Sequence, residues 1–114
     1  MTRVAAIDCG TNTIRLLVAE AHRDDSGRPH LEVLRRRNEI VRLGQGVDRT
    51  GLLDPEALER TLAAVASYAA DCTELGVAPG GDVRRFVATS ATRDARNRED
   101  FVAGVSRLLG IEPE

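Results

Sequence analysis

Residues 4–18, VAAIDCGTNTIRLLV, decide the fold. Residues 3–7 are short and apolar, which is typical of a buried strand. Residues 8–12 follow as a predicted tight turn, because Asp, Asn and Gly stabilise turns and Gly10 accepts a positive φ. Residues 13–19 are the second strand, with alternate side chains on opposite faces. Two strands joined by such a short turn predict a β-hairpin at the start of the chain.

The rest of the chain alternates the patterns of strands and helices. Arginines in a third strand suit a sheet edge, where charge discourages unwanted pairing. Asp54 and Pro55 mark the start of a long helix, and Gly76 follows its end. We expect strands at residues 3–7, 13–19, 31–37 and 83–89, a helix at 55–75, and a helix that starts at 92–96, is capped or re-capped at Asn97 and ends at Gly110. This order, β-β-β-α-β-α, predicts an α/β fold with helices packed on a mixed sheet, and residues 111–114 look like the approach to another strand.

Length and composition limit the class of protein. The chain has 114 residues, which is room for one domain, with 42% hydrophobic and 30% charged residues. A net charge of −2 and only 3% aromatic residues argue against a nucleic-acid-binding protein. No apolar run approaches the ~18 residues of a membrane-spanning helix, and two cysteines are too few for a disulfide framework. We therefore expect a cytoplasmic protein with neither a membrane nor a nucleic-acid partner.

The turn at residues 8–13, DCGTNT, carries groups that can bind a phosphate. A glycine turn followed by small polar side chains can form an anion-binding concavity from backbone N–H, hydroxyl and amide donors. Asp8 supplies a carboxylate oxygen, the kind of ligand that Mg²⁺ prefers, and this ion often bridges to phosphate. Together these groups suit phosphoryl transfer. The alternative is a plain hairpin turn in which Asp8 and Asn12 make only local hydrogen bonds.

A second group of polar residues occupies 89–97, TSATRDARN, where a strand leads into a helix. Hydroxyl groups at a helix start favour anion binding, and Arg93 is a planar cationic donor suited to phosphate. We expect this strand end to lie beside the first turn, so that both line one crevice at the carboxyl ends of the strands. The alternative is that Ser90 or Thr92 merely caps the helix and that Arg93 pairs with a nearby acid.

Both motifs resemble those of the Ppx/GppA phosphatases, the exopolyphosphatase and guanosine pentaphosphate phosphohydrolase family. Residues 4–18 are similar to the opening pattern of that family, A-x-I-D-x-G-S/T-N-S/T-x-x-L-x-V. Residues 87–97, VATSATRDARN, resemble its second N-terminal signature, with Phe101 at the position of an aromatic. Two motifs in the right order at the right separation are far more specific than either alone.

The resemblance implies the ribonuclease-H-like fold of the actin, hexokinase and heat-shock chaperone superfamily, with an active cleft between two domains. Residues 1–114 would be the N-terminal portion of domain I, and the remainder of domain I and domain II would lie outside them. The implied reaction is hydrolytic release of a terminal phosphate from inorganic polyphosphate, or of the 5′-terminal phosphate from guanosine pentaphosphate. Asp8 would lie at the Mg²⁺ site. The implied phosphate-binding residues are Gly10, Thr11, Asn12, Thr13, Arg15, Ser90, Arg93 and Asn97.

Two parts of the family pattern are expected to lie outside residues 1–114. The general base of the family is a Glu in a segment beyond Glu114, and the second phosphate loop lies further on. We therefore assign no catalytic residue within residues 1–114 and expect this polypeptide alone to be inactive or nearly so. The alternatives are a sugar-kinase-like fragment, since D-x-G-T turns also open those chains, and a non-catalytic module that binds polyphosphate or a nucleotide. An exposed apolar face would favour a homodimer.

Other side chains also suggest possible roles. Residues 35–37, three arginines, could guide a polyphosphate chain or form a solvated edge strand. Cys9 is expected to be a small packing residue and not a nucleophile, because no histidine is close in sequence to activate its thiol. Cys72 is expected in the core. His22 and His30 flank a surface loop without metal-ligand spacing, and both are expected to be exposed to solvent.

Overall fold

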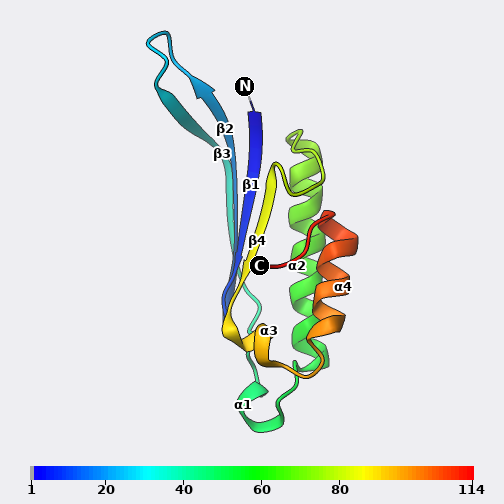
Figure 1. Cartoon of the computed structure of the whole chain (residues 1–114). Coiled ribbons are helices and arrows are strands. Elements are labelled where there is room, and N and C mark those ends of the chain that lie inside the picture. The colour runs from blue at the N-terminus through cyan, green and yellow to red at the C-terminus, as the bar shows by residue number, and fades with distance from the viewer. Residues whose placement is uncertain (1) are drawn as a thin grey trace.

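A computed structural model describes residues 2–114, apart from the side chain of Ser90, and these residues form a four-stranded mixed sheet with helices on one face (Figure 1). The strand order is β3-β2-β1-β4. The predicted α/β fold and the order of its main elements are confirmed, the short helix α1 is an addition, and the last predicted helix is divided into α3 and α4. In chain order the elements are β1 (Thr2–Cys9), β2 (Thr13–Arg23), β3 (Pro29–Ile40), α1 (Val47–Thr50), α2 (Pro55–Glu74), β4 (Arg84–Ala88), α3 (Ser90–Asp94) and α4 (Arg98–Leu109).

The β1–β2 hairpin is the centre of this sheet. Its strands are antiparallel and pair as far as Cys9 opposite Ile14, so residues 10–12 make the turn. The predicted hairpin is confirmed, but its turn is shorter than predicted, because Asp8 and Cys9 still pair with β2. Alternate residues of both strands, Ile7 and Ile14 among them, are buried. The hairpin therefore presents one apolar face to the helices.

β3 and β4 complete the sheet on either side of the hairpin. β3 pairs antiparallel with β2 and lies at the edge, as its arginines predicted, although it continues further along the chain. β4 pairs parallel with β1, which places Cys9 opposite Ala88. Glu114 adds a further pairing to β4: its N–H donates to the Phe86 carbonyl over 2.8 Å, and its carbonyl accepts from the Ala88 N–H over 3.0 Å. The last residues thus approach the sheet as predicted.

α2 and α4 pack against each other on one face of the sheet (Figure 1). α2 begins as predicted, because the Asp54 carboxylate accepts a hydrogen bond from the Ala57 N–H over 3.1 Å and Pro55 occupies the first turn. Gly76, just beyond its end, adopts a φ of 77°. Gly110 ends α4 with a φ of 74°. Both are left-handed conformations that glycine adopts without a side-chain clash, which explains these helix ends.

The core lies between the sheet and these two helices. Tyr68, Phe86 and Phe101 are its largest fully buried side chains, and Cys72 lies among them as predicted. Phe86 and Phe101 meet edge to face with ring centroids 5.8 Å apart. The Tyr68 hydroxyl donates to the Ile14 carbonyl over 3.0 Å. This bond satisfies the polar end of a side chain that is otherwise enclosed by apolar atoms.

A buried cation joins the ends of both long helices. Arg84 is 5% exposed, and its guanidinium donates to the Val77 carbonyl, just after α2, over 2.7 Å. It also donates over 3.2 Å to the carbonyl of Leu109, the last residue of α4. Within residues 2–114 no acidic side chain pairs with it. Helix C-termini carry partial negative charge, so the carbonyls at these two ends take the place of a counter-ion.

The other face of the sheet carries no helix within the described residues (Figure 1). Exposed side chains from all four strands lie on it, Asp8, Arg15 and Val87 among them. An open groove of about 730 Å³ crosses this face. In the described part of the chain, no helix is long and apolar enough to cross a membrane.

Candidate functional site

The two polar motifs meet at one edge of the sheet. Because β1 and β4 are parallel, their carboxyl ends lie together, and the Thr89 N–H donates to the Cys9 carbonyl over 3.2 Å. The side chains then come into contact: the hydroxyl oxygens of Thr11 and Thr89 are 3.4 Å apart, although 78 residues separate them in sequence. The prediction that the first turn lies beside the start of residues 89–97 is therefore confirmed.

The first turn is closed by its own backbone. The Gly10 N–H donates to the Thr13 carbonyl over 2.9 Å. A Cβ at Gly10 would lie 3.2 Å from that carbonyl oxygen, so a side chain there would crowd the turn. Thr11 and Asn12 are exposed at its tip, and Thr13 is half-buried at the start of β2. The turn thus directs polar side chains to solvent while its backbone stays fixed.

A second loop, residues 41–46, wraps around this turn. The N–H groups of Val41 and Arg42 both donate to the Asn12 carbonyl, each over 2.9 Å, and the Gly44 N–H donates to the Thr11 carbonyl over 2.9 Å. Arg42 adopts a φ of 51°, which is uncommon for a residue with a side chain. The sequence did not predict that this loop contacts the first turn. The available signal was the pair of glycines in RLGQG, close to the buried Val41.

Asp8 and Arg15 lie on the open face of the sheet, beside the turn. They are directly opposite each other in the β1–β2 ladder and line the groove together with Arg36 and Asn38. Within residues 2–114, leaving the Ser90 side chain aside, Asp8 makes no side-chain hydrogen bond or ion pair. Its exposed carboxylate is therefore available to a cation.

The second signature, residues 89–97, makes one set of contacts at its start and another at its end. At its start, the Thr92 hydroxyl and the Arg93 N–H both donate to the Thr89 carbonyl, over 2.8 and 3.4 Å. Arg93 is exposed beside Thr89 and forms no ion pair within the described residues, so the alternative in which it pairs with a nearby acid is not seen. Ser90 is the first residue of α3, and its side chain lies outside the described part.

The end of the signature braces another loop. The Asn97 side chain accepts from the Leu53 N–H over 2.8 Å and donates to the Leu53 carbonyl over 3.0 Å. Next to it, an Arg96 guanidinium nitrogen donates to the Thr50 carbonyl over 2.6 Å. Asn97 occupies the N-cap position of α4, as predicted, but makes no side-chain cap bond. The structure does not bring the Asn97 side chain to the place where Thr11 and Thr89 meet, because its amide is hydrogen-bonded to the backbone of Leu53.

Comparison with known proteins identifies the chain. A family model described as the Ppx/GppA phosphatase family matches residues 20–114. The chain belongs to this family. Exopolyphosphatase 2 of Mycobacterium tuberculosis is 49% identical over 110 residues, which cover 96% of this chain and 33% of that protein. Exopolyphosphatase 1 of the same species is 28% identical. The chain therefore spans about a third of the length of the curated exopolyphosphatases it matches.

Solved structures of the Ppx/GppA family share the fold. A family member from Aquifex aeolicus matches with a TM-score of 0.83 and 33% identity over 99% of this chain and 34% of that one. An exopolyphosphatase from Cytophaga hutchinsonii matches with a TM-score of 0.81 and 27% identity over 99% of this chain and 33% of the other. The fold is thus the ribonuclease-H-like fold of the actin and hexokinase superfamily, as expected. The sugar-kinase-like alternative loses its support.

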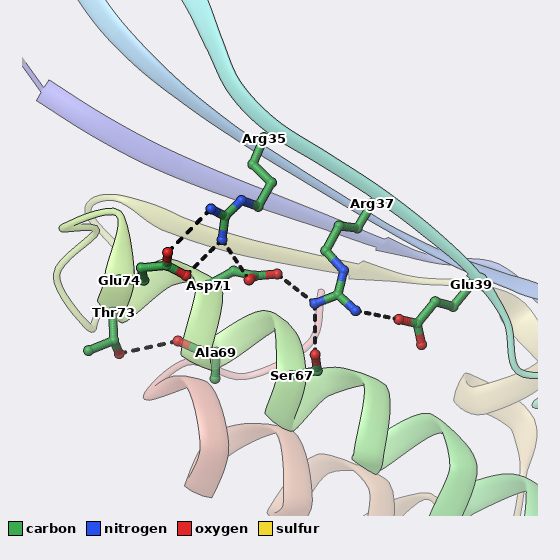
Figure 2. A network of polar contacts seen from close by, with 8 residues as sticks. All are labelled: Arg35, Arg37, Glu39, Ser67, Ala69, Asp71, Thr73 and Glu74. Atoms are coloured by element: carbon green, nitrogen blue, oxygen red, sulfur yellow. Dashed lines mark hydrogen bonds and ion pairs between the residues drawn. The ribbon is translucent and has the colours of Figure 1, made fainter.

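In this Ppx/GppA chain the three arginines at residues 35–37 are divided between the two faces of β3. Figure 2 shows Arg35 and Arg37 directed at α2, where both guanidinium groups contact the buried Asp71, each over 2.7–2.8 Å. Arg35 also contacts Glu74, and Arg37 also contacts Glu39. Arg36 is exposed and lines the groove on the open face, and Arg37 borders the same groove while its guanidinium contacts Asp71. The run is therefore mainly a clamp between the edge strand and α2, and not a continuous basic track.

The cysteines and histidines take no part in the site that the Ppx/GppA motifs form. Burial and the nearby Asp8 charge raise the pKa of Cys9 to about 12, so its thiol stays protonated and is a packing residue, as predicted. His22 is half-buried and stacks on His30 with ring centroids 5.7 Å apart, so the prediction that both are exposed is wrong for His22. It escaped prediction because β2 extends through it. Within residues 2–114, no group of three His, Cys, Asp or Glu side chains gathers to hold a metal.

Proposed function

We propose that this Ppx/GppA chain provides the first phosphate-binding turn of a phosphohydrolase. The substrate is inorganic polyphosphate, from which a terminal phosphate is released, or guanosine pentaphosphate, which loses its 5′-terminal phosphate. The main support is the 3.4 Å separation of the Thr11 and Thr89 hydroxyl oxygens, which brings donors from two distant segments to one edge of the sheet. The relatives named as exopolyphosphatases favour polyphosphate over guanosine pentaphosphate.

The proposed site supplies donors and positive charge to phosphate oxygens, which is what stabilises phosphoryl transfer. Thr11 and Thr89 donate from their hydroxyls, and Asn12 adds an exposed amide at the tip of the turn. Arg15 and Arg93 add guanidinium charge. Both are exposed, and neither pairs with an acid among the described residues. Their N–H groups are therefore available to a polyanion.

Asp8 is the proposed Mg²⁺ ligand. Mg²⁺ usually keeps several waters and binds through one or two carboxylates together with substrate phosphates, so it needs no cage of protein side chains. A single exposed carboxylate beside Arg15, at the end of β1, fits that requirement. A bound ion would offset charge on the transferred phosphate. The task of Asp8 is to hold that ion next to the turn.

We further propose that this polypeptide alone binds phosphate chains without hydrolysing them, since we assign no general base within residues 1–114. Hydrolysis also needs a group that orients and deprotonates the attacking water. Incubating the chain with polyphosphate and Mg²⁺ and measuring released phosphate tests this. Rapid release would contradict it.

A chimera tests the activity itself. This chain replaces the matched third of exopolyphosphatase 2 from Mycobacterium tuberculosis, and phosphate release from polyphosphate is measured. We expect the chimera to be active, and Asp8→Asn to lower its rate by about 100-fold or more, as removal of one charge-stabilising group does. Asp25→Asn, at an exposed position in the β2–β3 loop, is the control that should leave the rate unchanged. A folded but inactive chimera whose isolated N-terminal chain still binds tripolyphosphate would favour the non-catalytic binding module.

A further inference from the structure

Gly44 touches the first turn at a point where a side chain has no room. A Cβ built at Gly44 would overlap the Cγ2 methyl of Thr11, and its next contacts, the Thr11 carbonyl oxygen and Cβ, would be ordinary at 3.4 and 3.5 Å. Gly44 is not among the glycines with a positive φ. Its backbone would therefore accept alanine, and the requirement for glycine comes from the Thr11 methyl group alone.

The loop that carries Gly44 has little freedom to move away. Leu43 and Val41, its apolar residues, are 0% and 3% exposed. Arg60 of α2 donates to the Val41 carbonyl and to the Gln45 side chain, both over 3.1 Å. The loop is thus anchored in the core, to α2 and to the turn itself.

The Thr11 side chain is then the part that would yield. Threonine carries its methyl and its hydroxyl on the same Cβ, so a rotation about χ1 that removes the methyl from an added Cβ also moves the hydroxyl. The hydroxyl would leave its position 3.4 Å from the Thr89 hydroxyl. A single methyl group at residue 44 would therefore separate the two donors of the site.

We propose that Gly44 is a positioning residue for the phosphate site: its missing side chain lets Thr11 keep the rotamer that directs its hydroxyl toward Thr89. The ligand in this statement rests on the proposed function. The steric coupling between Gly44 and Thr11 does not, and it can be measured without ligand.

The test uses the 114-residue chain and four variants: Gly44→Ala, Thr11→Ser, the double variant, and Gly81→Ala as a matched control. Gly81 also has an ordinary φ, but a Cβ there would meet nothing within 4 Å. Thr11→Ser keeps the hydroxyl and removes the methyl that alanine would meet. Binding of Mg²⁺-tripolyphosphate is measured by calorimetry, and the Thr11 and Thr89 amide resonances by NMR without ligand.

We expect Gly44→Ala to weaken tripolyphosphate binding by about 10-fold or more, as misplacement of a site group by an ångström can do. Gly81→Ala should bind like the parent chain. The double variant should recover the affinity and the amide shifts of Thr11→Ser. Recovery of binding by a second, smaller side chain is a result that general destabilisation by alanine would not give.

Two results would overturn the proposal: unchanged binding and amide shifts in Gly44→Ala, or a double variant as impaired as Gly44→Ala. If the parent chain binds no tripolyphosphate, the proposed function fails, and the unliganded amide shifts still decide on Gly44. Thermal unfolding of all variants identifies any that fail to fold. If Gly44→Ala is unfolded, a folded double variant supports the steric coupling and an unfolded one refutes it.

Discussion

Asp71→Asn should destabilise the protein by releasing the edge strand from α2. The side chain of Asp71 is 12% exposed and accepts from Arg35 and Arg37, whose side chains are each 31% exposed. Breaking a fully buried ion pair costs about 3–5 kcal/mol, whereas an exposed pair is worth about 0–1 kcal/mol. Both arginines are partly exposed, and each keeps a second acid, Glu74 or Glu39. We therefore expect an intermediate loss of about 2 kcal/mol in the free energy of unfolding.

Urea denaturation at neutral pH measures this loss, and thermal unfolding should show a fall in Tm of roughly 6–10 °C. Glu114→Gln is the control, since the Arg85–Glu114 pair has side chains that are 68% and 52% exposed, and it should leave the free energy of unfolding nearly unchanged. A double-mutant cycle of Asp71→Asn with Arg37→Met isolates the pairwise energy. The reasoning is refuted if Asp71→Asn costs no more than the control, or if the cycle shows no coupling.

Other perturbations test separate parts of the structure. Asn97→Ala leaves both backbone groups of Leu53 without their partner, so it should cost about 2–3 kcal/mol in a urea titration; an unchanged midpoint would contradict this. Cys9 should resist iodoacetamide at pH 8 in the folded chain and react after unfolding, because its pKa is raised to about 12; labelling of the folded state would show an accessible thiolate. Hydrogen bonds from Ser26, then His30, lower the pKa of Asp24 from 3.8 to about 2. Its folded pKa is depressed, so its stabilisation is complete above about pH 4 and is lost as pH falls through 2; an NMR titration with a midpoint near 4 would be the contrary result.

Local patterns were sufficient to predict much of the fold. The short turn within residues 4–18 predicted the hairpin, and Asp54 with Pro55 predicted the start of α2, because turns and helix caps depend on residues that are neighbours in sequence. The meeting of Thr11 and Thr89 also followed from sequence, since the carboxyl ends of adjacent parallel strands share an edge.

Contacts between distant segments could not be predicted in the same way. Asn97 resembles a helix cap by its position, but its partner Leu53 is 44 residues away and leaves no local pattern. The three arginines at residues 35–37 look alike in sequence, yet strand alternation and the acids on α2 separate them. The role of the loop at residues 41–46 could not be predicted, because it is defined by hydrogen bonds to the backbone of the first turn.

The contacts of Arg84 hold β4 to the ends of α2 and α4, and they do not depend on a group that acid protonates. The hydrogen bond to Arg35 lowers the pKa of Glu74 in the folded chain, so its contribution to the joint between β3 and α2 is lost as the pH falls through that lowered pKa. The joint around Arg84 relies on peptide carbonyls at two helix ends, which do not titrate. At low pH we therefore expect partial unfolding, in which the edge strand β3 detaches while α2, α4 and β4 stay packed together.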